Sequence, residues 1–142
     1  MRPVMKLLIV DDCVDIVNIL SSFLELSGHE IDKALDGIEA AELLRNNSYD
    51  VVITDAEMPR MGGAELCRHI KSDFPATYVI GMSGSFQALN DFKAAGADIC
   101  FAKPFHLEEM ENAVENIWSS GRSGSAVAGD SFWSYSERLS SL

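Results

Sequence analysis

Five short apolar runs alternate with five stretches of helical periodicity, and this alternation limits the fold more than any other feature of the chain. The apolar runs span residues 6–10, 30–35, 51–53, 78–82 and 99–102. The helical stretches span residues 14–26, 38–45, 64–70, 86–95 and 107–118. Apolar strands that alternate with helices form a parallel sheet covered on both faces, and right-handed crossovers wind it in both directions. The sequence therefore predicts an α/β fold: a doubly wound five-stranded parallel sheet in three α/β/α layers.

The pattern divides the chain into one domain, residues 1–118, and a tail, residues 119–142. Run 30–35 is the most polar of the five, which places it near an edge of the sheet. The tail opens with a Gly/Ser-rich stretch typical of a flexible linker. Its last part carries Phe132, Tyr135, Leu139 and Leu142 at helical spacing. Two interpretations stay open for that part: a frayed terminus, or a short amphipathic segment that docks on the domain or on a partner.

Charge and cysteine content exclude several classes of function. The net charge of −11 argues against direct binding to nucleic acid, because phosphates repel an acidic surface. The three cysteines are widely spaced and form no CxxC pair, so neither a disulfide framework nor a zinc site is expected. The sequence shows neither a membrane-spanning run nor a signal peptide. We therefore expect a cytoplasmic protein without membrane insertion.

Charged and polar side chains follow four of the predicted strands. Asp11 and Asp12 follow the first strand, Asp55 ends the third, Ser83 the fourth and Lys103 the fifth. Because the carboxyl ends of parallel strands meet at one edge of the sheet, these groups should share a single cleft. Three crowded carboxylates need a cation, and hard oxygen ligands suit Mg²⁺. The alternative, solvated acids that cap helices, would explain one such residue but not the whole set.

Over residues 5–118 the chain resembles the receiver domain of two-component response regulators, which has a CheY-like, flavodoxin-like (βα)5 fold. No single motif is specific, but their order and spacing along the βα repeats are. The matching residues are Asp11-Asp12, Asp36-Gly37-Ile38-Glu39-Ala40, Asp55-Ala56-Glu57-Met58-Pro59-Arg60-Met61-Gly62-Gly63, Gly81-Met82-Ser83-Gly84, Gly96-Ala97-Asp98 and Lys103-Pro104-Phe105.

The resemblance assigns a metal site and a nucleophile. It makes Asp55 the phosphoryl acceptor, whose carboxylate attacks phosphorus and forms an acyl phosphate. It implies that Mg²⁺ is bound by Asp12 directly, by Asp11 through water, by Asp55, and by the backbone carbonyl of Glu57. Phosphoryl transfer depends mainly on positioning and charge neutralisation, which such a site supplies.

The resemblance also assigns groups that bind the phosphoryl oxygens. Lys103 pairs with Asp55 and then with a phosphoryl oxygen, while the Ser83 hydroxyl and the backbone N–H of Ala56 bind others. Ser83 is expected to move toward the phosphoryl group when the domain switches. In the family an aromatic residue three positions before the lysine moves with this hydroxyl. That position is Cys100 here, and its neighbour Phe101 should face the opposite side of the sheet.

These assignments predict a signalling switch rather than an enzyme: a stoichiometric phosphoryl acceptor that loses the group slowly by its own hydrolysis. The implied donor is a histidine kinase or histidine phosphotransfer protein, and the implied target is a downstream protein effector. Two alternatives stay open. One is a receiver-like adaptor that works without phosphorylation, which the departure at Cys100 favours. The other is a phosphohydrolase with an aspartate nucleophile, for which Asp55 and Glu57 have suitable spacing.

The oligomeric state follows less directly from the sequence. Receivers often dimerise through the fourth and fifth helices and the strand between them. The fifth helix carries Glu108, Glu109, Glu111 and Glu115 with little positive charge nearby. Like charges oppose such an interface, so at most a weak dimer is expected.

Overall fold

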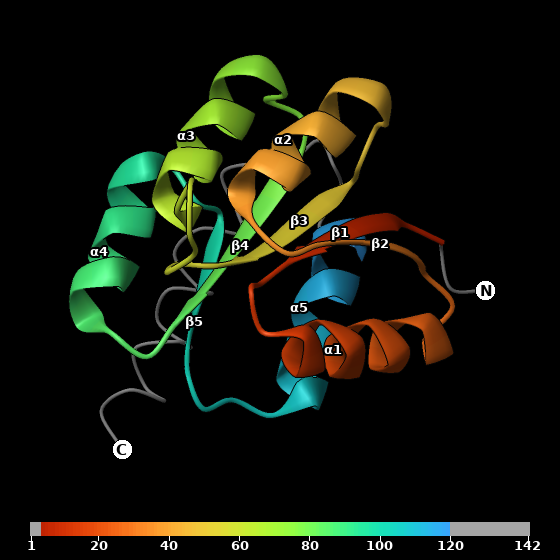
Figure 1. The fold of residues 1–142 in the computed structure, drawn as a ribbon. Helices are drawn as coiled ribbons and strands as arrows, with labels where there is room; N and C mark the ends of the chain where they lie inside the picture. The colour runs from red at the N-terminus through yellow and green to blue at the C-terminus, as the bar shows by residue number, and fades with distance from the viewer. Residues whose placement is uncertain (1–3, 120–142) are drawn as a thin grey trace.

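The computed structural model describes residues 4–119. In this part of the chain five strands alternate with five helices (Figure 1). The strands are β1 (Lys6–Val10), β2 (Glu30–Ala34), β3 (Val51–Asp55), β4 (Tyr78–Ser83) and β5 (Ile99–Ala102). The helices are α1 (Val14–Leu26), α2 (Gly37–Asn46), α3 (Gly63–Asp73), α4 (Phe86–Ala95) and α5 (Leu107–Ser119).

All five strands join one parallel sheet in the order β2-β1-β3-β4-β5. Helices α2, α3 and α4 cover one face, and α1 and α5 cover the other (Figure 1). The predicted doubly wound three-layer fold is therefore confirmed. The polar run 30–35 forms β2, which is an edge strand, as its composition predicts.

Each face of the sheet has its own hydrophobic core. Leu7, Ile53 and Phe101 belong to the core under α1 and α5, whereas Val52 and Phe92 belong to the core under α2, α3 and α4. All five residues of β3 are buried. A strand buried on both faces reads as a continuous apolar run, which is why the sequence revealed β3 by its apolar residues 51–53.

The strand that carries the acceptor is longer than its apolar run. Thr54 and Asp55 continue β3 because their backbones pair with Gly81 and Met82 of β4. Apolar content alone ended the predicted strand at residue 53, but backbone pairing does not depend on side-chain polarity. Asp55 is thus held by the sheet itself rather than by a loop.

The capping of α2 explains why β2 stops at Ala34 instead of residue 35. The Asp36 side chain accepts a hydrogen bond from the Glu39 N–H at 2.8 Å, and Glu39 Oε1 accepts one from the Leu35 N–H at 3.1 Å. This reciprocal arrangement is a capping box, shifted so that Glu39 reaches the residue before the cap. It takes Leu35 out of the strand and begins α2 at Gly37.

The predicted tail, residues 119–142, lies outside the described residues except for Ser119, which ends α5. Both interpretations of the tail therefore stay predictions. Within residues 4–119, no helix combines the length and the apolar character that a bilayer crossing requires.

Candidate functional site

Three carboxylates meet where the strand order reverses, between β1 and β3. Asp55 is the last residue of β3, and Asp11 and Asp12 follow β1 directly. One ligand oxygen from each of the three lies within 4.8 Å of the others. Ligands of doubly wound sheets bind outside the carboxyl ends of the strands at such a switch point. The structure thus brings together the three acids that the sequence placed in one cleft.

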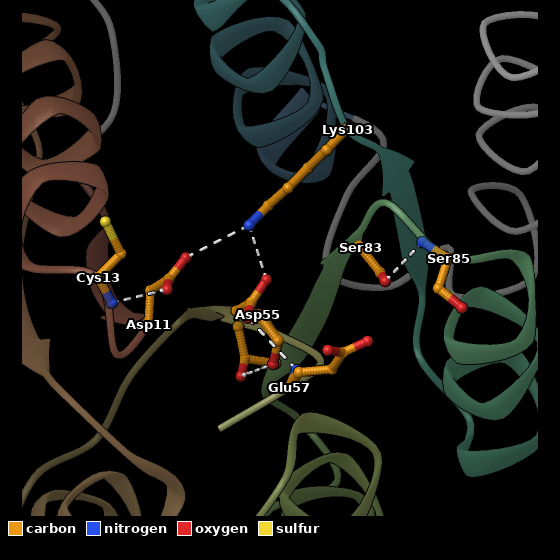
Figure 2. Close-up of polar contacts among 8 residues, drawn as sticks. Asp11, Cys13, Asp55, Glu57, Ser83, Ser85 and Lys103 are labelled. Atoms are coloured by element: carbon orange, nitrogen blue, oxygen red, sulfur yellow. Dashed lines mark hydrogen bonds and ion pairs between the residues drawn. The ribbon is translucent and has the colours of Figure 1, made fainter. Parts of the chain in front are cut away.

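Lys103 extends from the end of β5 across the sheet edge toward these acids (Figure 2). Its Nζ lies 2.7 Å from Asp55 Oδ1 and 3.6 Å from Asp11 Oδ2. The first distance is a charge-assisted hydrogen bond, and the second is an ion pair too long to be one. One ammonium therefore serves two carboxylates, with Asp55 as its main partner.

Backbone N–H groups hold the other oxygens of these two carboxylates. The Cys13 N–H donates to Asp11 Oδ1 at 3.0 Å, an Asx-type turn that leads into α1. The Glu57 N–H donates to Asp55 Oδ2 at 3.3 Å. Both carboxylates are buried, whereas Asp12 is exposed. Asp55 is thus fixed at both oxygens, by Lys103 and by its own loop.

The donor set fits a divalent cation of the Mg²⁺ type. The Asp11 Oδ2 atom is buried and has no hydrogen-bond partner among the described residues. A buried carboxylate oxygen without a donor is costly, and a cation bound by Asp11, Asp12 and Asp55 would satisfy it. The single ammonium of Lys103 leaves these three acids with an excess of negative charge. Hard carboxylate oxygens, one of them on the exposed Asp12, match the preferences of Mg²⁺.

Protonation equilibria reflect the same crowding. Burial raises the pKa of Asp11, and the charges of Asp55 and Asp12 raise it further, against the Cys13 hydrogen bond and Lys103. A raised carboxyl pKa means that the folded state disfavours ionised Asp11. Its ionisation opposes folding at neutral pH, and this cost disappears below the unfolded value, where both states are protonated. A bound cation would relieve the cost.

The pKa of Lys103 moves in the direction that keeps it charged. Burial alone lowers this pKa, but the hydrogen bond and charge of Asp55, helped by Asp11, outweigh burial and raise it above the ordinary value. Lys103 therefore remains an ammonium throughout the neutral range. It can supply a positive charge to the site without a change of protonation.

The Ser83 hydroxyl and the Ala56 N–H, the two groups expected to bind phosphoryl oxygens, each have another hydrogen-bond partner in the structure. Ser83 ends β4, and its hydroxyl accepts a hydrogen bond from the Ser85 N–H at 3.0 Å; no hydrogen bond to Asp55 is found within residues 4–119. The Ala56 N–H donates to the Met82 carbonyl at 3.1 Å. The sheet thus already uses the donor that the resemblance assigns to the phosphoryl group, and that assignment stays a prediction. The Glu57 N–H, in contrast, points at Asp55.

Cys100 and Phe101 lie on opposite faces of β5, as strand alternation predicts. Cys100 belongs to the core under α2, α3 and α4, and Phe101 to the core under α1 and α5. Phe101 stacks at a tilt on Phe105, with ring centroids 5.4 Å apart. Burial raises the pKa of the Cys100 thiol to about 12, so it behaves as a small buried apolar group. Phe101 cannot replace the missing aromatic at position 100, because it faces the other layer.

Sequence reasoning missed a contact that holds the acceptor loop. Arg60 Nε and Nη2 donate to Asp36 Oδ2 at 3.0 and 2.7 Å, which ties the loop after β3 to the start of α2. Arg60 has φ +70°, a left-handed conformation that is uncommon for a residue with a side chain. A charge pair separated by 24 residues carries no local pattern, and only the turn-forming residues Pro59 and Gly62 indicated a shaped loop.

Comparisons with known proteins agree with this geometry. The family model for the response regulator receiver domain matches residues 7–115. Response regulator MprA of Mycobacterium sp. (strain KMS) is 35% identical over 108 residues, which cover 74% of this chain and 46% of that protein. The CpxR homolog of Haemophilus influenzae, a transcriptional regulatory protein, is 33% identical over 114 residues, covering 79% and 49%. The chain thus spans about half the length of these two relatives.

A solved structure shows the same fold. The chemotaxis response regulator CheY4 of Vibrio cholerae superposes with a TM-score of 0.75 at 28% sequence identity, and the match covers 81% of this chain and 99% of that one. A family model over most of the chain, relatives above 30% identity and this superposition all agree. The chain belongs to the receiver-domain family of two-component response regulators, whose members signal by phosphorylation.

Proposed function

We propose that Asp55 accepts a phosphoryl group from a phosphohistidine of a sensor kinase or phosphotransfer protein, with Mg²⁺ bound by the neighbouring acids. The observation that carries this proposal is the 2.7 Å contact between Lys103 Nζ and Asp55 Oδ1 inside the three-acid cluster. A carboxylate that is buried, oriented at both oxygens and next to a fixed ammonium has the features of a positioned nucleophile.

In the proposed transfer step, the phosphoryl group passes from the imidazole of the donor to the carboxylate of Asp55. A carboxylate oxygen of Asp55 forms a bond to phosphorus while the P–N bond of the donor breaks, and the imidazole nitrogen keeps the electron pair. Mg²⁺ would neutralise charge on the transferring group. Lys103 exchanges its bond to Asp55 for one to a phosphoryl oxygen, and the Glu57 N–H and Ser83 hydroxyl bind others. These donors stand where negative charge develops, which lowers the barrier.

The product changes the charge of this edge of the sheet. A phosphoryl group adds roughly 1.5 to 2 negative charges and several strong acceptors. We expect the Ser83 hydroxyl to leave the Ser85 N–H and turn toward it. The surface formed by β4, α4 and β5 would then change its affinity for a protein effector. Because each phosphoryl group is used once and released slowly by water, the domain acts as a switch and not as an enzyme.

Intact mass measures this proposal directly. Incubation of the protein with acetyl phosphate and Mg²⁺ should add one phosphoryl group, because a small donor needs only the acceptor site. EDTA should prevent the addition, and Asp55→Asn should abolish it while leaving the circular dichroism spectrum unchanged. A folded wild type that takes up no phosphoryl group, from acetyl phosphate or from a phosphorylated donor protein, would contradict the proposal and favour the adaptor alternative.

An apolar groove beside the acceptor suits a donor protein. It has a volume of about 480 Å³ and is lined by Ile16 and Ile19 of α1, by Phe105 of the loop between β5 and α5, and by Leu107 at the start of α5. Lys103 also lines it. The Ile19 side chain is 54% exposed. An apolar helix surface seated here would hold its phosphohistidine next to Asp55, since Lys103 contacts both groove and acceptor.

Ile19→Glu is expected to slow phosphoryl transfer from a phosphorylated histidine phosphotransfer domain by about 10-fold, because a charge in an apolar contact costs roughly 1.4 kcal/mol or more. Transfer from acetyl phosphate should stay within about twofold of the wild type. Leu26→Glu is the matched control, since Leu26 is 88% exposed on the same helix and does not line the groove. Equal slowing with both donors would show that Ile19→Glu disturbs the acceptor site instead of docking. Measurement requires only the transfer rates from the two donors.

A further inference from the structure

Phe92 is the main anchor of α4. It is fully buried, and the only other residue of this helix that is buried is the small Ala95. The α4 helix therefore has only one large side chain that is fully buried against the sheet. Whatever displaces the Phe92 ring displaces the helix, since close-packed interiors have little free space to absorb a shift.

The Phe92 ring is wedged between two glycines of different elements. A Cβ added to Gly81 of β4 would lie 2.6 Å from ring atoms Cδ2 and Cγ. A Cβ added to Gly63, the first residue of α3, would lie 2.7 Å from the ring atom Cζ. Side-chain carbons do not approach this closely, so both positions need glycine for the ring to fit. One rigid ring thus touches β4 and the start of α3 together.

Both glycines are joined directly to the phosphorylation site. Gly81 precedes Ser83 by two residues and so faces the same side of β4. The Gly63 N–H donates to the Ala56 carbonyl at 2.8 Å, and Gly63 packs against the carbonyl of Asp55. The ring of Phe92 therefore touches two residues that connect directly to the groups around the acceptor.

The neighbouring strand leaves this space open. Cys100 pairs with Gly81 in the sheet and faces the same core as Phe92. The adjacent small residues Gly81 and Cys100 leave room for a large ring, and Phe92 of α4 fills this room. The large aromatic ring beside Gly81 thus comes from α4 and not from β5.

We propose that Phe92 is the positioning residue through which the phosphorylation site sets the place of α4. Movement of Ser83 or of the loop after Asp55 shifts Gly81 or Gly63. Because the Phe92 ring packs tightly against both glycines, with no free space between them and the ring, the ring and its helix move as well. The inference rests on the proposed function, since it concerns the response to a group on Asp55. The ring is a mechanical link and touches no reacting atom.

The test compares amide NMR spectra of the full chain with Mg²⁺, before and after beryllofluoride, a stable mimic of a phosphoryl group on a carboxylate. The wild type should show shifts at Glu57 and Ser83 and also along α4. Phe92→Leu should keep the shifts at the site and lose at least half of the shift along α4, because leucine fills volume but does not reach both glycines. Phe92→Met provides a second variant of similar volume if the first does not fold.

Leu89→Ala is the control, because Leu89 is a partly buried residue of the same helix that packs on the same core. It should preserve the α4 response. Full α4 shifts in both Phe92 variants, or site shifts without α4 shifts in the wild type, would overturn the inference and leave the proposed function intact. A wild type with no shift at Glu57 and Ser83 would overturn the proposed function and the inference with it.

Discussion

Lys103→Met is expected to slow the uptake of a phosphoryl group from acetyl phosphate by about 100-fold, similar to the loss of one oxyanion donor in other active sites. Lys103 Nζ lies 2.7 Å from Asp55 Oδ1 and is the only side-chain cation within 4.0 Å of Asp11 or Asp55 in the described part of the chain. Methionine keeps much of the apolar length of the side chain and removes the charge. The transferring group then loses a donor at the point where its negative charge develops.

The measurement is the initial rate of phosphorylation, read by intact mass at saturating Mg²⁺. Lys33→Met serves as the matched control, because Lys33 is an exposed lysine of β2 whose Nζ lies 3.2 Å from Asn18 Oδ1. It should leave the rate within about twofold of the wild type. A Lys103→Met protein that is phosphorylated as fast as this control would remove Lys103 from the transfer step.

The Lys103→Met variant should also change its affinity for Mg²⁺. The charge of Lys103 therefore has two effects, one on the occupancy of the metal site and one on the transferring group. Without Lys103, the three acids have no compensating ammonium, so the cation becomes their only neutralising partner. We therefore keep Mg²⁺ saturating in the rate measurement. Any remaining loss of rate then reports the transferring group and not the occupancy of the metal site.

Phe101→Ala is expected to lower the free energy of unfolding by about 3–5 kcal/mol, the usual cost of removing a large aromatic side chain from a core. Phe101 is 1% exposed and among the largest fully buried side chains of the structure. Its ring packs on Phe105 at 5.4 Å between centroids. The substitution removes apolar burial, leaves a cavity and breaks an aromatic pair, and all three effects have the same sign.

Urea unfolding followed by circular dichroism gives the midpoint and the slope, from which the change is calculated. Phe86→Ala is the control, because Phe86 is 69% exposed at the start of α4 and should change stability by less than about 0.5 kcal/mol. A loss of 3–5 kcal/mol is a large share of the roughly 5–15 kcal/mol typical of a domain. Equal midpoints for the two variants would show that the core under α1 and α5 tolerates the cavity.

The fold could be predicted from the sequence because its signals are local. Each buried parallel strand is an apolar run, and each helix has a repeating apolar stripe, so the order of the elements can be read along the chain. The acids at the ends of β1 and β3 then follow from topology alone, since parallel strands place these ends at one edge. Asp11, Asp12 and Asp55 were found in this way, and the structure brings them within 4.8 Å.

The use of individual backbone donors was not predictable in the same way. Whether the Ala56 N–H is free depends on the register between β3 and β4, which gives it to the Met82 carbonyl. The Glu57 N–H remains available for Asp55 because the chain leaves the sheet one residue later. Hydrogen-bond pairing across strands is set by the assembled sheet. The identity of a residue does not show which carbonyl its backbone N–H will bind.

Long-range packing settled the rest. The Arg60 contact with Asp36 joins residues 24 positions apart, and the Phe92 ring enters a space made by Gly63 and Gly81 on two other elements. The sequence by itself determined which elements form and which side chains gather at the sheet edge, because periodicity and strand ends are properties of neighbouring residues. Only the tertiary structure decided which backbone N–H binds Asp55, which cation pairs with Asp36, and which ring packs on Gly63 and Gly81. Those contacts depend on distances between elements that no local pattern encodes.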